Sequence, residues 1–453
     1  ICSRAGVDRR KVTSVSEPTR LMNKNFFLLW QGQFVSRLGS QAFTIAMMFW
    51  LKHATGSATL MGTIMMLSML PMVILSPFGG TFADLHSRRR IIIVCDIIYG
   101  TAVLSLAFLM FLRPDQTAAI IVWLTVVAVV SGVVSAFFHP AVIAAVPSIV
   151  PTDKVAAANS FNEGTFQVST LIGQGVGGVL FRLLGAPVLF LIDGLTFLYS
   201  ALSEKFISIP QTLPEKKASW REEIHRFGAE TFEGMRYVWR RTGLRNLFVA
   251  SAFLNFFAMP FLVLLPFYVE DVLGKSSDWY GFFMAGYGGG SLVGYVLYGS
   301  LRISGRARSR LLIVCLILFS SCLVVFGLSR RPFLSLGMMI MAGILGGIYN
   351  VAAMTLIQLS TPADFRGRMF GLLHTVVMGL SPISMGLAGV VADILDQNVA
   401  LMFVVCGLMI TAISIVTAAN KEYRRFLAFE PPAETEPVTD SQPPESGPGG
   451  ALM

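Results

Sequence analysis

The stretch GGTFADLHSRRR, from Gly79 to Arg90, predicts the class of fold to which this chain belongs. It separates two apolar runs, near residues 58–82 and 91–112, and each run has about the ~20 residues that a helix needs to cross a bilayer. A helix satisfies its own backbone hydrogen bonds in lipid, whereas the aspartate and the three arginines of the stretch favour water. We therefore predict a tight loop between two transmembrane helices.

The composition also indicates a membrane protein. Of the 453 residues, 54% are hydrophobic and only 13% are charged, which leaves too much apolar surface for one soluble core. The net charge of +9 could indicate a nucleic-acid partner, but the basic residues are scattered over short loops instead of forming one stripe. The five cysteines show no metal-like spacing. We expect a lipid bilayer around the chain, no nucleic acid, no metal and no cofactor.

Apolar runs separated by polar breaks recur along the chain in two sets. The first set lies near 26–51, 58–82, 91–112, 119–141, 160–182 and 186–207. The second set lies near 244–269, 279–301, 311–329, 333–359, 370–392 and 398–419. The sequence thus predicts an all-α membrane protein with twelve transmembrane helices in two six-helix bundles.

Polar segments divide the chain into five predicted parts. These are a disordered or non-native leader (1–21), an N-terminal six-helix bundle (22–207), a cytoplasmic amphipathic linker (208–243), a C-terminal six-helix bundle (244–420) and a disordered, acidic, Pro-rich tail (421–453). On this assignment 28 lysines and arginines lie in the two tails and alternate loops, six lie in the other loops, and Arg37 lies inside a span. Because cytoplasmic loops carry the excess of basic residues, we expect both termini in the cytoplasm.

The two sets of spans resemble each other. Sliding the chain by 211 residues places VPTDKVAAANSFNE (150–163) over TPADFRGRMFGLLH (361–374) without a gap. The same shift aligns Gly175 with Gly386 and Gly178 with Gly389. This pattern favours a parallel duplication of six spans.

Several segments together resemble the major facilitator superfamily, and within it the macrolide-efflux and enterobactin-exporter-like permeases. They are NKNFFLLWQGQFVSRLG, SPFGGTFADLHSRRR, SAFFHPAVIAAVPSIVP, FLIDGLTFLYSA, LNFFAMPFLVLLPFYVEDVLG and IYNVAAMTLIQLSTPADFRGRMFGLL. The resemblance covers residues 23 to about 420. It implies two six-helix bundles that rock about a central cavity, and export of drugs or siderophores against a proton gradient.

The loop after the second span resembles the Gly-x-x-x-Asp-Arg-x-Gly-Arg-Arg motif of that family. The matching residues are Gly80, Asp84, Arg88 and Arg89, whereas Leu85 and Ser87 depart from the motif. An aspartate at a helix end can accept from the exposed amides of a neighbouring helix N-terminus and pair with Arg88. We expect a latch that breaks when the bundles rock; the alternative is a basic loop that only sets topology.

The fifth span carries a glycine-rich run that resembles the Gly-Pro-x-x-Gly-Gly antiporter signature of the family. Its gating candidates are Gly173, Gly177 and Gly178, and Gln174 stands in place of the proline. Small residues let two helices approach closely and close one side of a cavity, although generic packing explains them equally well. The fourth span lacks the arginine that the family links to proton transfer, so coupling must use other groups or another ion.

Among the ionisable residues within predicted spans, we select four candidates for ion coupling: Arg37, Asp96, Glu163 and Asp193. At 1.5 Å per residue, Arg37 lies roughly 18 Å from the cytoplasmic start of span one and Asp193 roughly 10 Å from the outer start of span six. In a core about 30 Å thick these depths nearly coincide. We predict that the two can pair, for coupling or as a structural ion pair. Asp96 and Glu163 lie near cytoplasmic span ends, where they serve an inner gate or reach interfacial water.

Three polar residues of the first span share one helical face: Gln33, Arg37 and Gln41. Asn255 lies at a matching depth in the seventh span. Buried amides need partners, which a wet cavity or a neighbouring helix supplies. We predict that these four residues contact the substrate, with hydrogen bonding between helices as the alternative.

Together, the residues and the resemblance predict a monomeric secondary transporter of the cytoplasmic membrane that exports small amphipathic, drug-like or macrolide-like molecules by alternating access and proton antiport. Nothing resembles the Gly-x-x-x-x-Gly-Lys-Ser/Thr loop of an ATP-driven pump. A dedicated siderophore or lysophospholipid exporter is an alternative, and a non-transporting membrane interaction protein is another. A membrane enzyme would need a nucleophile and a base at one depth, and the spans offer no such grouping.

Overall fold

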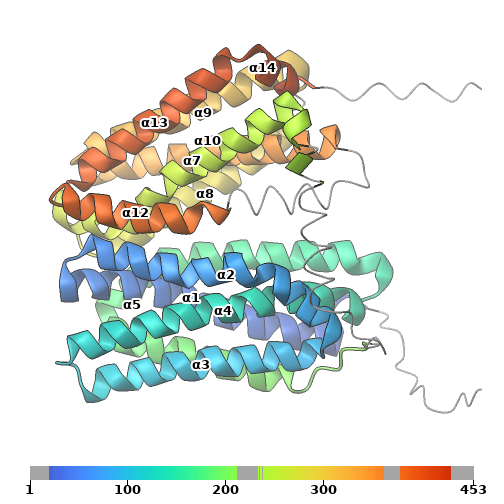
Figure 1. Ribbon diagram of the computed structural model, residues 1–453, viewed down its shortest axis with the longest axis vertical. Helices are drawn as coiled ribbons and strands as arrows, with labels where there is room; N and C mark the ends of the chain where they lie inside the picture. Colours follow the sequence, from blue (N-terminus) through green and yellow to red (C-terminus); the bar gives the residue numbers. More distant parts are fainter. Residues whose placement is uncertain are drawn as a thin grey trace, which may run out of the picture.

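The computed structural model describes residues 20–211, 238–301, 303–361 and 378–429, together with residues 233, 235 and 236. These residues form helices and turns, without a strand among them. The helices run roughly parallel to one another in two stacked groups, one from each half of the chain (Figure 1).

The first group comes from the N-terminal half. Its helices are α1 (Lys24–Thr55), α2 (Ala58–Leu85), α3 (Arg88–Leu112), α4 (Thr117–Ile149) and α5 (Val155–Glu204), with a short turn, η1 (Thr152–Lys154), before α5. Helix α5 has 50 residues and is interrupted at Gly185, whose φ of 72° is not helical. The interruption falls between the predicted spans 160–182 and 186–207, so the two halves of α5 correspond to those spans.

The second group comes from the C-terminal half. Its helices are α7 (Thr242–Phe267), continued by the π turn η2 (Tyr268–Val272), then α8 (Asp278–Ser300), α9 (Gly305–Leu328), α10 (Pro332–Ser360), α12 (Ser381–Ile394), α13 (Val399–Ala419) and α14 (Lys421–Leu427). The predicted disordered tail from residue 421 is wrong at its start. Tyr423 and Leu427 are buried, and the Asn420 side chain caps α14, so this short helix packs onto the bundle.

Within the described residues, eight helices are long and apolar enough to cross a membrane. They are α2, α3, α4, α5, α7, α9, α10 and α13. Large apolar side chains stay exposed around them, as at Ile143 (68%) and Phe333 (77%), because lipid rather than protein covers that face. The apolar length and exposed periphery make the chain a multi-pass membrane protein.

Local sequence chemistry explains where the first two helices begin and end. The Asn23 side chain accepts from the Phe26 amide at 3.0 Å and starts α1, and Gly56 ends it with a φ of 65°. The Ser57 hydroxyl then accepts from the Leu60 amide at 3.2 Å and starts α2. The α1–α2 turn is therefore tight, and it marks one end of the molecule, the α1–α2 end. The α2–α3 loop marks the opposite end, the α2–α3 end.

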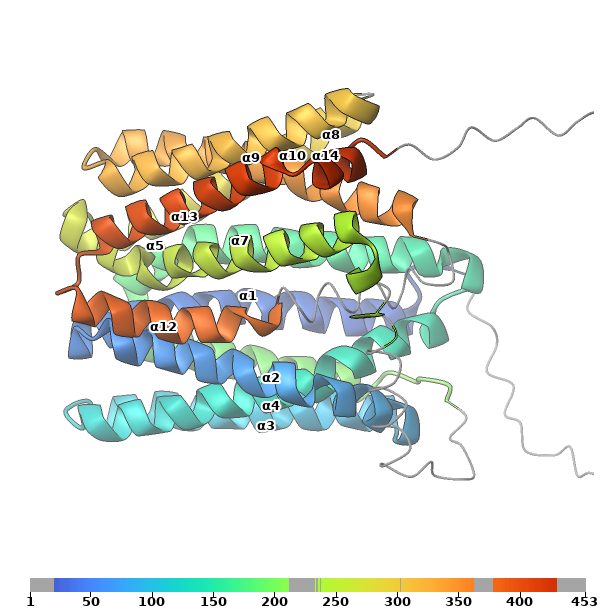
Figure 2. The same cartoon turned by 45° about the horizontal axis from the view of Figure 1, so that its top comes forward.

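Two close helix crossings join the halves. Helix α5 packs against α8, and α12 packs against α2 (Figures 1 and 2). A Cβ at Gly178 would lie 2.2 Å from the Ser277 carbonyl oxygen, and one at Gly389 would lie 2.2 Å from the Ala58 carbonyl oxygen. The two glycines that the 211-residue shift aligned thus occupy corresponding crossings, which agrees with a duplicated architecture.

Some predicted segments lie outside the described residues. These are residues 1–19 of the leader, most of the amphipathic linker and residues 430–453 of the tail. The part of the internal repeat that covers residues 362–374 lies outside them as well.

Candidate functional site

The larger cavity of the candidate site has a volume of about 590 Å³ and lies within the C-terminal half. Helices α7, α8, α9 and α10 supply almost all of its walls. The lining residues are Ser251, Leu254, Asn255, Ala258, Tyr287, Leu316, Phe319, Gly346, Tyr349, Asn350, Ala353, Met354, Ile357 and Met378. Aromatic and aliphatic groups predominate, with a few amides and hydroxyls among them, which is the usual lining of a small-molecule site.

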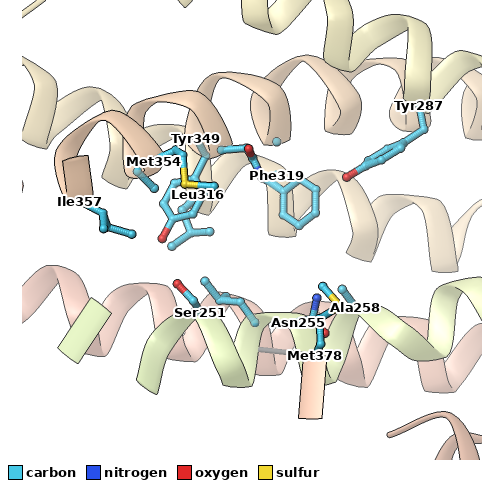
Figure 3. A pocket seen from close by; sticks show the side chains of 14 residues that line it. Ser251, Asn255, Ala258, Tyr287, Leu316, Phe319, Tyr349, Met354, Ile357 and Met378 are labelled. Carbon is cyan, nitrogen blue, oxygen red and sulfur yellow. The ribbon is translucent and has the colours of Figure 1, made fainter. Parts of the chain in front are cut away.

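Polar groups on two helices face each other across this cavity. Ser251 and Asn255 of α7 lie opposite Tyr349 of α10 (Figure 3). The Asn255 carbonyl oxygen accepts from the Ser381 hydroxyl at 2.7 Å, which fixes the amide orientation. Asn255 is therefore a predicted substrate residue that lines the cavity.

A smaller cavity of about 200 Å³ joins the two halves of the molecule. It shares Tyr287, Gly346 and Asn350 with the larger cavity. The first half of α5 adds further wall residues, Gln167, Thr170, Leu171 and Gln174. Because α5 belongs to the N-terminal half, the combined site has walls from both halves.

The predicted residues of α1 lie behind these cavities and do not line them. The Gln41 carbonyl oxygen accepts from Gln174 at 3.2 Å, so Gln41 positions a side chain that does line the smaller cavity. The Arg37 guanidinium donates to the backbone and side-chain oxygens of Asn162, both at 3.3 Å, and lies 5.5 Å from the centroid of the Phe166 ring. Gln33 is buried and donates to Glu204 at 3.2 Å.

The predicted pair between Arg37 and Asp193 is absent. Asp193 is fully buried and accepts from the Tyr99 hydroxyl at 3.1 Å and from the Ser40 hydroxyl at 3.4 Å. Arg37 points to the part of α5 before Gly185, whereas Ser40 faces the part of α5 after Gly185. Arg37 and Asp193 therefore lie at similar depths in the bundle but on different sides of α1. Depth along a helix can be predicted from the sequence, whereas the direction in which a side chain points around the helix axis relative to its neighbours cannot.

Asp96 lies in the core of the N-terminal half, so interfacial water does not reach it. It is 0% exposed and adjoins Ser200 and Glu204. Glu204 is 1% exposed and is a buried acid that the sequence analysis missed. In the sequence, Glu204 directly precedes Lys205, which is typical of an acid and a base in water at the membrane surface. Only the burial of Glu204 in the structure shows that it is not such a surface residue. Glu163, by contrast, is exposed and close enough to Arg37 to interact with its charge.

The α2–α3 loop contains part of the predicted latch. Asp84 pairs with Arg88 at 3.2 Å. Arg88 also donates to the Ala144 carbonyl at 2.8 Å, and Arg89 donates to the Lys205 carbonyl. A Cβ at Gly80 would meet no atom within 4 Å. All these partners belong to the N-terminal half, and Asp84 caps no helix of the other half within the described residues.

Ionic contacts between the halves occur instead at the α1–α2 end. Lys52 pairs with Glu270 at 2.7 Å and with Asp271 at 2.8 Å, and His53 approaches Glu270 at 2.9 Å. In this cluster both basic side chains come from α1 and both carboxylates come from η2. These four residues are absent from the predicted set because the predicted spans end just before them, at residues 51 and 269, which left them in predicted loops. A separate ion pair at the same end joins Arg182 of α5 to Asp278 of α8 at 3.0 Å.

Asp393 forms a further connection at that end. Its carboxylate accepts from the Ser57 hydroxyl at 2.9 Å, the Ala58 amide at 3.1 Å and the Thr59 amide at 2.8 Å. An aspartate of α12 therefore caps the N-terminus of α2, where the helix dipole favours a negative charge. The predicted chemistry of helix capping across the halves is thus present, with a different aspartate and at the opposite end of the molecule.

Of the three predicted gating glycines of α5, Gly178 contacts this interface, whereas Gly177 and Gly173 pack within the N-terminal half. Gly178 lies against the start of α8, where the Ser277 hydroxyl donates to the Gly178 carbonyl at 2.9 Å. Gly177 and Gly173 pack on α1, where added Cβ atoms would lie 2.4 Å from Ile45 and 2.5 Å from Gln41. Between described residues, the hydrogen bonds and ion pairs that join the two halves all lie at the α1–α2 end.

Two helical halves that surround a cavity and are joined at one end define a polytopic membrane protein of the transporter class. The chain belongs to the Major Facilitator Superfamily, whose family model matches residues 29–385.

The chain is similar to two bacterial efflux proteins. It is 24% identical to macrolide efflux protein A of Streptococcus pyogenes, over 88% of this chain and 96% of that protein. It is also 24% identical to the multidrug efflux pump Tap of Mycolicibacterium fortuitum, over 76% of this chain and 83% of that protein.

Solved structures share the fold. A bacterial homologue of the human lysosomal transporter Spinster, in an inward-facing and unoccupied conformation, has a TM-score of 0.64 and 17% identity, and covers 89% of this chain and 96% of that one. The nucleoside transporter NupG has a TM-score of 0.68 and 11% identity, and covers 88% of this chain and 98% of that one. Membership of this family indicates a membrane transporter.

Proposed function

We propose that the protein is a secondary active transporter that exports small amphipathic molecules by alternating access and proton antiport. The cavity supports the substrate class, because its aromatic and aliphatic walls suit apolar groups and its amides suit a few polar atoms. The similarity to a macrolide efflux protein and a multidrug efflux pump supports the direction of transport. The transporter acts as a monomer in the bacterial cell membrane.

The proposal includes twelve spans and cytoplasmic termini. Helices α1 and α8, with 32 and 23 residues, are long enough to span and less apolar than the eight helices above. Together with α12 and the second half of α5, they bring the number to twelve. The arginines of the α2–α3 loop then lie in the cytoplasm, and the α1–α2 end faces outward.

The single observation that carries the mechanism is that the contacts between halves gather at one end. Lys52, Asp393 and Gly178 hold the α1–α2 end together, while the cavity lies further inside the molecule. This arrangement supports an inward-facing state, in which the outer mouth is closed. Exchange with an outward-facing state requires these contacts to break and the opposite end to close.

The coupling residues are proposed as Asp193, Asp96, Glu163 and Arg37. Asp193 and Asp96 are buried acids without an arginine or lysine partner among the described residues, and such groups are costly to ionise in a bilayer. Glu163 and Arg37 interact beside the first half of α5. Protonation at these positions would change the charge in the N-terminal half as the halves rock.

Proteoliposomes test the proposed function. Purified protein is reconstituted with a labelled panel that contains macrolides, neutral amphiphiles, a siderophore and a lysophospholipid, and a pH gradient is imposed. We expect gradient-driven movement of several amphipathic compounds. Strict dependence on the siderophore or the lysophospholipid would replace this proposal with a dedicated exporter, and absence of flux for the whole panel would refute it.

A further inference from the structure

A groove outside the central cavity runs between α7 and α13, near the α2–α3 end of the molecule. The two helices contact each other along it (Figure 2). Its volume is about 540 Å³, comparable with the larger central cavity. The deeper part is apolar, with Val249 and Phe253 on α7 and Ile413 and Val416 on α13. Three of these side chains are exposed on the lipid-facing surface, so the groove opens toward lipid.

The polar part of the groove carries hydrogen-bond donors that have no protein acceptor. The Asn246 side-chain nitrogen is buried and unbonded, and within the described residues the side chains of Arg245 and Trp239 have no hydrogen-bond partner. The two other polar lining groups are already bonded. Asn420 caps α14 by accepting from its amides, and the Thr417 hydroxyl donates to the Ile413 carbonyl at 2.8 Å.

The position of these donors matches a membrane surface. Arg245 follows the first residue of α7 by three positions, and Thr417 precedes the last residue of α13 by two. The donors therefore lie where both helices leave the apolar layer, and Val249 and Phe253 lie one and two turns deeper. Tryptophan and arginine at such a level are typical of contacts with lipid headgroups.

The charge of the residues in and beside the groove indicates which kind of lipid headgroup would bind there. No carboxylate lines the groove within the described residues, whereas Arg245 lines it. The adjacent α14 carries three exposed basic residues, Lys421, Arg424 and Arg425, and one exposed acid, Glu422, so its net charge is positive as well. A basic pocket between helices at the cytoplasmic side favours a phosphate that carries net negative charge. The apolar depth below the donors is suited to an acyl chain.

We propose that this groove is a binding site for one anionic phospholipid. Its phosphate accepts from Arg245, Asn246 and Trp239, and one acyl chain lies between α7 and α13. The site goes beyond the proposed transport activity and does not depend on it. Because both helices line the groove, a lipid bound there contacts α7 and α13 together.

Native mass spectrometry of the detergent-purified full chain tests the site with defined probes. Phosphatidylglycerol and phosphatidylcholine with identical acyl chains are added at equal concentration. We expect preferential retention of one phosphatidylglycerol. Arg245→Gln should reduce that retention about fivefold, and Arg245→Lys should restore most of it. Arg425→Gln, an exposed arginine of α14 outside the groove, is the matched control and should retain the lipid like the wild type.

Two further arms separate the headgroup from the acyl chain. Ala412→Phe places a ring in the groove and should reduce retention of phosphatidylglycerol with the basic groups intact. Inorganic phosphate should compete poorly, because it lacks the acyl chain. Equal retention of the two lipids would overturn the proposal. So would wild-type retention of phosphatidylglycerol by the Arg245→Gln or the Ala412→Phe variant, or displacement of phosphatidylglycerol by inorganic phosphate. These binding measurements stand whether or not the protein transports any compound of the panel.

Discussion

At the scale of single residues, burial distinguishes two kinds of polar group in this protein. Asn255 lines the cavity and is oriented by Ser381, so its amide is available to a substrate. Asp193 is sealed from water and bonded to Tyr99 and Ser40. The first kind suits substrate recognition, and the second suits a proton-dependent change of charge.

Replacing Asn255 with leucine should weaken substrate binding. The change removes a cavity hydrogen bond worth about 1 kcal/mol, which corresponds to a KM about fivefold higher with a nearly unchanged maximal rate. Transport kinetics in proteoliposomes measure both quantities. Met354→Leu, an apolar change in the same lining, serves as the control and should leave KM within a factor of about two. An Asn255→Leu variant with wild-type KM would exclude this residue from the substrate site.

Replacing Asp193 with asparagine should abolish the dependence of transport on the pH gradient, because an amide side chain neither gains nor loses a proton at the pH values of a transport assay. Initial efflux rates are compared with and without an inward proton gradient. Tyr99→Phe removes the hydrogen bond to Asp193 and keeps the acid, so this variant should still respond to the gradient. If Asp193→Asn responds as the wild type does, another group carries the proton.

At the scale of secondary-structure elements, closure of the α1–α2 end depends on two crossings, α5 with α8 and α12 with α2. Each crossing places a glycine against the first residues of the partner helix. The α12 crossing adds a carboxylate cap, and the α5 crossing adds the Arg182–Asp278 pair at 3.0 Å. The proposed rocking of the halves would require these contacts to break and reform.

The Asp393→Asn substitution should destabilise the outside-closed state. Loss of the charge at the α2 N-terminus costs about 0.5–2 kcal/mol, so the outer mouth should open more often. Spin-label distances across the outer mouth report the shift as a larger open population. Asp396→Asn is a matched control, because Asp396 lies three residues further on and its carboxylate forms no hydrogen bond or ion pair with α2 among the described residues. Equal distance distributions for both variants would exclude Asp393 as a latch.

Adding one methyl group at Gly178 should impair closure of α5 against α8. A Cβ there would lie 2.2 Å from the Ser277 carbonyl oxygen, a separation that the backbone can relieve only by moving apart. Gly178→Ala should therefore lower the transport rate several-fold without loss of expression. Gly164→Ala, in the same helix with no atom within 4 Å of the new Cβ, should transport normally. Similar losses in both variants would indicate a general effect of alanine in α5.

At the scale of the whole molecule, alternating access requires that the α1–α2 end open during each cycle. Arg182→Cys combined with Asp278→Cys places two thiols across the crossing of α5 and α8. A short, reducible thiol crosslinker should stop transport, and a reductant should restore it. The cysteines of the described residues are all buried, which limits competing reactions. Undiminished flux through the crosslinked protein would contradict rocking of the two halves.

Much of the architecture follows from local features of the sequence. Long apolar runs predict helices that lipid surrounds, and eight of the described helices meet that expectation. Helix ends follow from residues such as Asn23 and Gly56, whose chemistry acts within one turn. The cavity residue Asn255 was also predictable, because its depth along α7 depends only on helical rise.

Directions around the helices were not predictable in the same way. Arg37 and Asp193 share a depth but point apart, and Glu204 is a buried acid despite its position beside a lysine. Asp393 caps an amide 335 residues away in the chain, a pairing that no local pattern contains. Each depends on how one helix is rotated and packed against another.

By itself, the sequence determined the helical membrane class, the duplicated halves and the family, because apolar length, glycine spacing and loop charge are properties of contiguous residues. Only the tertiary structure decided that the cavity lies mainly in the C-terminal half and that the halves are joined at the α1–α2 end. The physical reason is that helix rotation and contacts between distant helices are set by packing of the whole bundle, and the spacing of residues along one helix does not determine them.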